Sequence, residues 1–229
     1  MWFTWNGIDS RSFGLLISKL PSITRGQERV DQITIPGRSG HLIMKQGDDV
    51  RSGYRLDVSV ILPIQVDEQP ILAWLTGSGS AVFANDPTRC YDARIIGEVS
   101  FVRASNTLKT ATIPFWCQPY KAQYPTEGAI TLTGTTNTVT NPGDVASKPK
   151  VTIDTTGDVT VTIGGVAMAF SSLAAKIIVD CDAHIITNND GTLWTGTYTG
   201  NFWKLPKGQS TVTASKSCTI KIEPRWRWL

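Results

Sequence analysis

Two short runs of acidic and amide side chains are the first candidates for chemistry in this sequence. Asp180-Cys181-Asp182 and Asn188-Asn189-Asp190 carry side-chain oxygens of the kind that Ca²⁺ prefers. Neither run has the ligand spacing of a known calcium loop. Asn and Asp are also frequent in tight turns, and turn formation explains the second run fully. We therefore predict no metal site.

Residues that activate nucleophiles or bind zinc are sparse. The histidines are His41 and His184, and no GxSxG, HExxH or P-loop motif occurs. The four cysteines are widely separated and lack the close pairs of zinc sites: Cys90, Cys117, Cys181 and Cys218. Their neighbours alternate as in strands, which predicts small buried thiols in a reducing compartment. The sequence thus predicts a protein that is not an enzyme and holds no cofactor.

A group of aromatic residues suggests a different kind of site. Trp194, Tyr198, Phe202 and Trp203 lie close together in the sequence, and aromatic faces stack on sugar rings. The alternative is packing between the sheets of a β-sandwich, which uses the same residues. A sugar site requires Trp194 or Trp203 to be exposed beside polar side chains. If the group binds carbohydrate, the candidate binding residues are Trp194, Tyr198 and Trp203.

The run Arg225-Trp226-Arg227-Trp228 alternates basic and aromatic residues. Such a run could bind nucleic acid by stacking and charge. The alternative is a final strand with tryptophans inward and arginines outward, because side chains alternate between the faces of a strand. A formal net charge of +3 is too small to indicate nucleic acid by itself. We predict no sequence-specific nucleic-acid binding.

The composition predicts a folded protein outside the membrane. A length of 229 residues allows one large domain or two modest ones, and 41% hydrophobic with 18% charged residues can fill real cores. No apolar run reaches the length of a membrane span. The first residues lack a basic segment followed by an apolar one, so no signal peptide is expected. We predict no membrane insertion.

One helix is predicted in the first half of the chain, over residues 67–77. Asp67 can cap the first turn, and Pro70 is tolerated only there. Trp74 and Leu75 belong to a broad apolar face that we expect to be buried against a sheet. The strands predicted to form that sheet cover residues 54–62, 91–101 and 108–117, with Gln118-Pro119-Tyr120 ending the last of them.

A turn-rich break follows the strand predicted over residues 27–35. Pro36-Gly37-Arg38-Ser39-Gly40 demands positive φ at one or both glycines. The hydrophobic pattern then weakens from residue 40 to residue 53, which indicates an exposed loop or an arm. Residues 41–51 could lap over a neighbouring subunit or form a mobile loop. Arg38 could reach a carboxylate on that subunit or be an ordinary solvated arginine.

The composition changes near Gln123, where the chain becomes rich in Thr, Gly and Val. Residues 159–163 and 166–170 flank Gly164-Gly165, which predicts a hairpin. Further strands are predicted at residues 177–180, 211–214 and 218–222. Short strands at this spacing indicate a sandwich. We predict a mainly β fold of two β-sandwich domains, residues 1–123 with one short α-helix and residues 124–229.

Several motifs occur in an order and spacing that resemble one known family. In the first domain they are Trp5-Asn6-Gly7, Asp9-Ser10, Phe13-Gly14-Leu15, Ile35-Pro36-Gly37-Arg38-Ser39-Gly40, Trp74-Leu75, Asn85-Asp86-Pro87, Tyr91-Asp92-Ala93 and Phe115-Trp116-Cys117-Gln118-Pro119-Tyr120. In the second they are Asn141-Pro142-Gly143, Lys148-Pro149, Ile178-Val179-Asp180, Gly200-Asn201-Phe202-Trp203-Lys204-Leu205-Pro206-Lys207-Gly208 and Arg225-Trp226-Arg227-Trp228-Leu229. The family is that of the siphovirus distal tail proteins, the hubs of phage tails.

The resemblance implies a structural, non-enzymatic protein of the virion, located at the tail tip and assembled in the host cytoplasm. It implies a tail-tube-like N-terminal domain that forms a hexameric ring, and a galectin-like, jelly-roll C-terminal domain. The ring would connect the tail tube to the tip or baseplate proteins. A subunit of a tailocin-like device would have the same fold and would differ mainly in its partners. The alternative function is a carbohydrate-binding module that attaches the particle to the host cell.

The implied partners are further copies of the chain, the tail tube protein, the tail-tip or tail-associated hub protein, the tape measure protein and a receptor-binding protein. The candidate subunit-interface residues are Arg38, His41 and Met44. Ser39 departs from the family pattern, in which an acidic residue often occupies this position of the turn. A pairing made by that acidic residue would be missing or different here.

Overall fold

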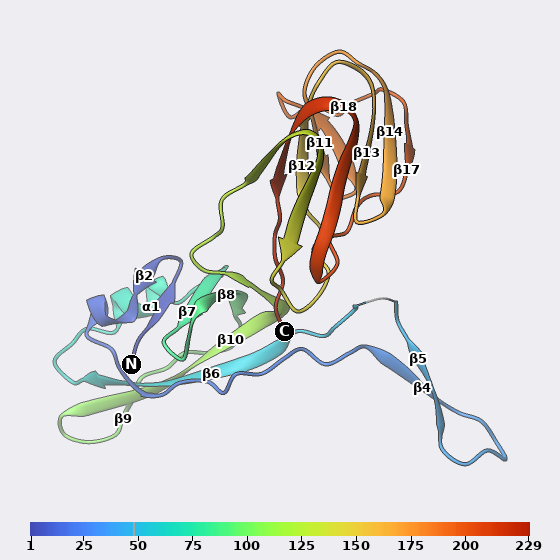
Figure 1. The fold of residues 1–229 in the computed structure, drawn as a ribbon. Helices are drawn as coiled ribbons and strands as arrows, with labels where there is room; N and C mark the ends of the chain where they lie inside the picture. The colour runs from blue at the N-terminus through green and yellow to red at the C-terminus, as the bar shows by residue number, and fades with distance from the viewer. Residues whose placement is uncertain (48) are drawn as a thin grey trace. The chain divides into compact units, whose positions relative to one another are not determined.

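Almost every element of this protein is a β-strand in the computed structural model, which describes residues 1–47 and 49–229. The chain divides into a first unit, Met1–Pro125, and a second unit, Thr126–Trp228 (Figure 1). Each unit is built around one curled eight-stranded sheet. The prediction of a mainly β chain with two sandwich-like domains and one short α-helix is confirmed.

The described residues of the first unit form ten strands, a 3-10 helix and an α-helix. They are β1 Phe3–Trp5, β2 Ile8–Asp9, η1 Ser10–Phe13, β3 Leu16–Lys19, β4 Val30–Thr34, β5 His41–Lys45, β6 Tyr54–Pro63, α1 Gln69–Trp74, β7 Ser78–Phe83, β8 Asp86–Ile95, β9 Val102–Arg103 and β10 Leu108–Gln123. The sheet order is β2-β1-β7-β8-β10-β6-β3, and β9 pairs with β10. All of these pairs are antiparallel.

Strand β10 organises the first sheet, because it pairs with β6 along one edge and with β9 and β8 along the other. The prediction that Gln118-Pro119-Tyr120 ends this strand is wrong. A bulge between Cys117 and Lys121 absorbs these residues, and the strand continues to Gln123. Pro119 is accepted there because a residue within a bulge need not donate to the ladder.

Aromatic side chains fill the core of the first unit. The ring of Phe115 meets those of Phe3, Trp5 and Phe83 edge-on, at centroid distances of 5.5–5.6 Å. This geometry matches the quadrupoles of the rings, since the positive edge of one faces the negative face of another. These residues come from three strands, so the cluster holds the sheet curled around it.

The helix α1 is shorter than predicted. It covers Gln69–Trp74, and the Asp67 carboxylate accepts a hydrogen bond from the Gln69 N–H at 3.1 Å. Leu75 is buried as expected, but Trp74 is only partly buried. The Trp74 ring stacks on Phe13 at 4.7 Å, and its Nε1 donates to the Trp5 carbonyl at 3.2 Å. The Trp74 side chain therefore lies at the margin of the core, where the end of α1 packs against η1.

The strand predicted over residues 91–101 is interrupted. Strand β8 ends at Ile95, and the chain leaves the sheet until β9 begins at Val102. Gly97 has a φ of +114°, a conformation that alternation of apolar residues cannot reveal. Ile96 is exposed as a result. We call residues 96–101 the excursion, and it leaves a gap beside β10.

The second unit contains eight strands. They are β11 Ile130–Asn141, β12 Lys150–Asp154, β13 Gly157–Ile163, β14 Val166–Leu173, β15 Ile177–Asp180, β16 Ile185–Asn188, β17 Tyr198–Gly200 and β18 Gly208–Glu223. The sheet order is β16-β15-β12-β18-β13-β14-β17, and β11 pairs with β18. The predicted hairpin is confirmed, because β13 and β14 are joined by Gly164 and Gly165, both with positive φ.

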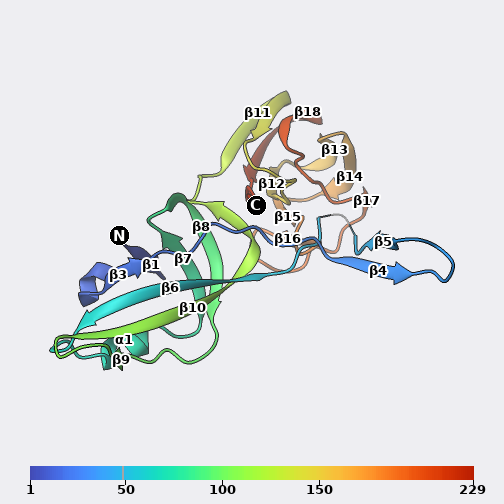
Figure 2. The same ribbon diagram turned by 90° about the horizontal axis from the view of Figure 1, so that it is seen from below.

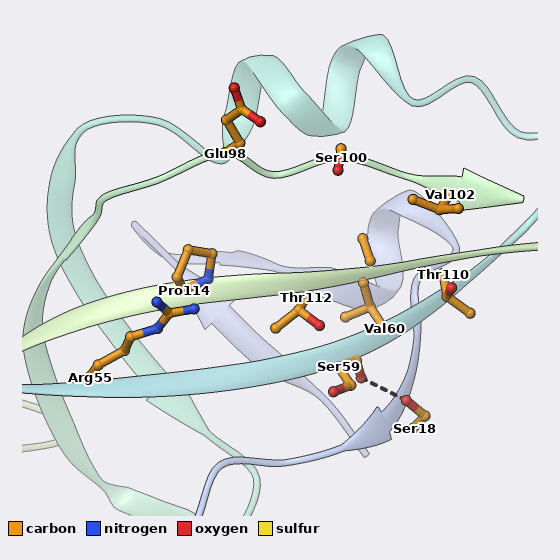
Figure 3. A pocket seen from close by; sticks show the side chains of 11 residues that line it. Ser18, Arg55, Ser59, Val60, Glu98, Ser100, Val102, Thr110, Thr112 and Pro114 are labelled. Atoms are coloured by element: carbon orange, nitrogen blue, oxygen red, sulfur yellow. Dashed lines mark hydrogen bonds between the residues drawn. The ribbon is translucent and has the colours of Figure 1, made fainter.

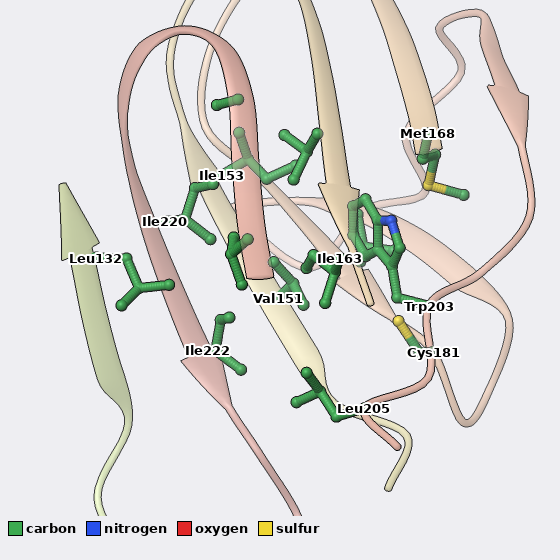
Figure 4. Close-up of a cluster of buried hydrophobic side chains, with 14 of the residues drawn as sticks. Leu132, Val151, Ile153, Ile163, Met168, Cys181, Trp203, Leu205, Ile220 and Ile222 are labelled. Carbon is green, nitrogen blue, oxygen red and sulfur yellow. The ribbon is translucent and has the colours of Figure 1, made fainter. Parts of the chain in front are cut away.

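Strand β18 joins the two halves of the second sheet. Its first half pairs with β13 and its last residues pair with β12, while β11 follows it on the other edge. The two separate late strands predicted from sequence are therefore one strand. The register shift opposite Gly134 lies where β18 changes partner, as expected for a bulge that bends a strand. The enclosed core combines branched aliphatic side chains with Trp203, which lies beside Met168 and Cys181 (Figure 4).

The thiols follow the prediction of buried, unpaired cysteines. Cys117, Cys181 and Cys218 are buried, Cys90 is partly buried, and all four are free. In the described part of the chain, α1 and the other helical turn fall far short of the length and apolar character that crossing a bilayer requires.

Candidate subunit interface

A two-stranded hairpin leaves the body of the first unit, and we call residues 27–52 the arm. Strands β4 and β5 pair with each other from Val30↔Lys45 to Thr34↔His41, and neither belongs to the eight-stranded sheet. Figures 1 and 2, seen from directions 90° apart, both show the arm extending away from that sheet. The predicted arm therefore exists, and it begins earlier in the sequence than predicted.

Backbone hydrogen bonds hold the arm from base to tip. Near the base, Ser52 N–H donates to the Gln27 carbonyl at 2.9 Å and Arg29 N–H donates to the Val50 carbonyl at 3.0 Å. At the tip, Arg38 N–H donates to the Ile35 carbonyl at 3.1 Å. Gly37 and Gly40 both have positive φ, as the turn prediction required.

Charge and close packing fix the base of the arm. The Arg51 guanidinium donates to the Gly26 carbonyl at 3.0 Å and to the Glu28 carboxylate at 3.1 Å. A Cβ at Gly26 would lie 2.8 Å from the Pro119 Cβ, so glycine is needed where the arm meets the bulge of β10. Arg51 is largely shielded from solvent, which makes this ion pair less screened than an exposed one. The arm is thus joined firmly to the sheet.

The arm exposes apolar side chains along most of its length. The exposed ones are Ile33, Ile35, Leu42, Ile43, Met44 and Val50, and Ile43 is 62% exposed. A two-stranded ribbon cannot bury both of its faces by itself. Contiguous exposed apolar side chains mark interaction sites. The arm therefore has the properties of a surface that a partner covers.

The three predicted interface residues all lie on the arm. Arg38 is at the tip, His41 opens β5, and Met44 is on β5 with half of its surface exposed. The His41 Nδ1 lies 3.2 Å from the Thr34 Oγ1, so this ring is held against β4. Their role in an interface stays a prediction.

Sequence reasoning missed that apolar residues of the first half of the arm are exposed. Ile33 lies on β4 and Ile35 directly follows it, and both are exposed. The informative signal was the uninterrupted run Leu42-Ile43-Met44, which places apolar side chains on both faces of β5. Such a run in a two-stranded ribbon that no other sheet or helix covers indicates a surface that a partner covers.

The aromatic group of the second unit is split between core and surface. Trp203 is 0% exposed, and its Nε1 donates to the Val166 carbonyl at 3.0 Å. Its assignment as a sugar-stacking residue is wrong for this reason: no face of the ring is accessible. Tyr198 is 41% exposed, and partly buried Trp194 lies 6.4 Å from it between ring centroids. These two residues remain candidates.

The first predicted calcium candidate is an ion-pair cluster. The Arg225 guanidinium donates to both oxygens of Asp180 at 2.8 Å, a bidentate arrangement. Asp182 accepts from Lys148 at 2.9 Å and from Arg227 at 3.2 Å. These carboxylates already have cationic partners, and no group of three metal-ligating side chains gathers anywhere in the described part of the chain. The cluster attaches the last residues to the turn after β15.

The second candidate is a turn, as its sequence predicted. The Asp190 carboxylate accepts from the Thr192 backbone N–H at 2.9 Å and from the Thr192 hydroxyl at 2.7 Å. The Asn188 side-chain amide donates to the same hydroxyl at 2.9 Å. The Asp190 carboxylate and the Asn188 amide are thereby used within the turn.

The ion pair of Asp180 predicts a pH dependence of stability. The hydrogen bonds from Arg225 lower the pKa of Asp180 to about 2, below its value in an unfolded chain. This group therefore stabilises the fold above about pH 4, and its contribution disappears as the pH falls from about 4 to about 2. Because Arg225 is exposed, we expect Arg225→Gln to cost only about 1 kcal/mol at pH 7.

Urea unfolding of the wild type and of Arg225→Gln, followed from pH 7 to pH 2, measures this dependence. The difference in unfolding free energy should shrink toward zero near pH 2. Lys207→Gln is the control, because Lys207 pairs with Asp144 at 3.6 Å and its side chain is more exposed. A difference that does not change with pH would contradict the assignment.

The final residues combine buried tryptophans with paired arginines. Trp226 and Trp228 belong to the core of the second unit, while Arg225 is exposed and Arg227 is partly exposed. The predicted alternation of inward tryptophan and outward arginine is confirmed. The segment makes only an isolated bridge to Val145, so it is not a regular strand. Buried indole rings cannot stack on bases.

Comparison with solved structures gives a match over the whole chain. No protein-family model matches the chain, and neither does any curated protein. The structure is similar to the crystal structure of the SPP1 Dit protein (gp 19.1), described as a paradigm of the hub adsorption apparatus in phages that infect Gram-positive bacteria. The TM-score is 0.73 at 15% identity, over 100% of this chain and 99% of that one. This match shows that the two chains share their fold throughout.

Proposed function

We propose that this chain is a distal tail protein: a structural, non-enzymatic hub at the tip of a phage tail. The observation that carries the proposal is the full-length match to the SPP1 Dit protein. A match over one sandwich would be weak support, because sandwiches serve many functions. Here the match covers both units, so the two folds follow one another in the same order along both chains.

In this proposal, residues 1–123 form a tail-tube-like domain that assembles into a hexameric ring. The exposed apolar arm supports self-assembly, since its residues need a partner surface. A repeated head-to-tail contact closes into a ring and leaves no unsatisfied surface. Arg38, His41 and Met44 lie at this contact. Residues 124–229 form a galectin-like domain.

The ring would connect the tail tube to the tip or baseplate proteins. Its partners would be the tail tube protein, the tail-tip or tail-associated hub protein, the tape measure protein and a receptor-binding protein. The protein would act in the virion after assembly in the host cytoplasm.

Native mass spectrometry of the purified 25.0 kDa chain tests the ring. We expect hexamers, or pairs of stacked hexamers, for the wild type. Ile43→Asp should yield folded monomers with an unchanged circular dichroism spectrum, because this side chain is exposed in the single chain and a charge there is desolvated only on assembly.

The matched control is Leu193→Asp. Leu193 is 68% exposed and lies in the second unit, outside the arm. This variant should assemble like the wild type. A wild type that stays monomeric at high concentration would contradict self-assembly through the arm, while the shared fold would stand. Loss of assembly in both variants would show a general effect of added charge.

The exposed ring of Tyr198 supports the second candidate function, attachment to cell-surface carbohydrate. Tyr198 and Trp194 present aromatic surface beside the edge strand β17. Binding of the chain to a glycan array, lost in Tyr198→Ala, would support this function. An array without hits would remove it.

A further inference from the structure

A groove crosses the outer face of the first sheet where its hydrogen-bond ladder is broken. Strand β10 pairs with β9 at Lys109 and Thr110 and with β8 from Phe115 onward. Between these positions, no backbone hydrogen bond of the described residues joins 111–114 to the excursion 96–101. A hollow of about 550 Å³ opens at this gap.

The groove is lined by small polar side chains, shown in Figure 3. Its hydroxyl-bearing residues are Ser18, Ser59, Ser100, Thr110 and Thr112. They come from strands β3, β6 and β10 and from the excursion, and only Ser18 uses its hydroxyl within this group, donating to the Ser59 carbonyl at 3.1 Å. Such walls suit a polar peptide segment with small side chains.

The backbone of β10 offers hydrogen bonds inside the groove. The Leu108 carbonyl accepts from Ala104 and Ser105 on the β9 side, so alternate residues from Leu108 onward direct their backbone groups toward the gap. Thr112 therefore offers an N–H and a C=O there. Pro114, the next residue facing the gap, has no N–H to leave unpaired.

The groove has one unpaired charge. Glu98 lies on the excursion at its rim, and no ion pair of the described residues involves it. Arg55 at the other side is already paired with Asp57 at 2.7 Å. A ligand with one cationic group beside small residues would therefore complement the groove.

The tip of the arm has this composition. Gly37-Arg38-Ser39-Gly40 is small and polar apart from Arg38, an exposed cation without an ion-pair partner among the described residues. The tip residues 36–40 make no ladder pairs, so their backbone groups are available apart from the Arg38 N–H, which donates to the Ile35 carbonyl. We propose that the arm tip of one copy docks into this groove of the next copy, with Arg38 paired to Glu98. This inference rests on the self-assembly proposed above.

Charge reversal at each end tests the contact. Sedimentation velocity and native mass spectrometry should show that Arg38→Glu and Glu98→Arg each raise the concentration needed for assembly by about tenfold or more, because each places like charges together. The double variant should recover assembly close to the wild type. Arg29→Glu is the matched control, since Arg29 is an exposed arm residue far from the tip.

The outcomes separate this inference from the proposed function. If the wild type assembles and neither charge reversal weakens that assembly, the pairing of Arg38 with Glu98 is overturned and the proposal of a ring stands. Two weakened single variants with no recovery in the double variant would also overturn the pairing. A monomeric wild type would overturn both proposals. Ser100→Trp, which fills the groove without changing charge, should weaken assembly, and normal assembly of this variant would overturn the groove as the docking site.

Discussion

Replacing Trp203 by alanine is expected to destabilise the second unit by about 3–5 kcal/mol. The indole is 0% exposed and lies 6.3 Å from the Phe170 ring between centroids. Its loss creates a large cavity in a core that is otherwise closely packed. It also leaves the Val166 carbonyl without the 3.0 Å hydrogen bond from Nε1.

Hydrogen exchange of the full chain, read peptide by peptide, measures this effect separately for each unit. Protection should fall in β13, β14 and β18 and stay unchanged in β6 and β10. Trp203→Phe is the control, because it keeps most of the apolar volume and should cost clearly less. A loss below about 1 kcal/mol in Trp203→Ala would contradict the central position of this ring.

The second large effect is expected at a buried ion pair in the first unit. Lys121 is 4% exposed, and its Nζ lies 3.6 Å from the Asp86 carboxylate. Tyr91 donates to the same carboxylate at 2.7 Å, and burial together with this bond raises the pKa of the Tyr91 hydroxyl, which stays protonated. Asp86→Ala should cost about 3–5 kcal/mol, since it leaves a buried ammonium group unpaired.

The double variant Asp86→Ala/Lys121→Met distinguishes the charge from the packing. It removes both charges and keeps the length of the lysine stem, so it should recover most of the lost stability in urea unfolding at pH 7. Equal losses in the single and double variants would show that the Tyr91 hydrogen bond, and not the unpaired charge, dominates.

The elements that sequence predicted correctly are those whose signals are local. The β13–β14 hairpin depends on Gly164-Gly165, which adopt the positive φ values that a two-residue turn needs. The signals for helix α1 were Asp67, which accepts a hydrogen bond from the Gln69 N–H, the position of Pro70 and an apolar face. The resemblance to the distal tail protein family predicted the fold that the match to SPP1 Dit shows.

The wrong predictions share a different cause. Residues 211–214 and 218–222 are one strand because β18 is paired with β11 on both sides of a bulge, and the partner is remote in sequence. Residues 96–101 leave the sheet although their apolar alternation continues. Periodicity reports which side chains are apolar, and it does not report where a ladder is interrupted.

The sequence by itself determined that the chain is a mainly β protein of two units, and that Gly37 and Gly40 lie in a turn. These properties follow from backbone preferences and from the period of the side chains. Tertiary structure decided which of these residues are accessible. It buried Trp203, paired Asp180 with Arg225, and exposed Ile43 on the arm. Burial and ion pairing depend on segments that are far apart in the chain, and only the folded structure brings those segments together.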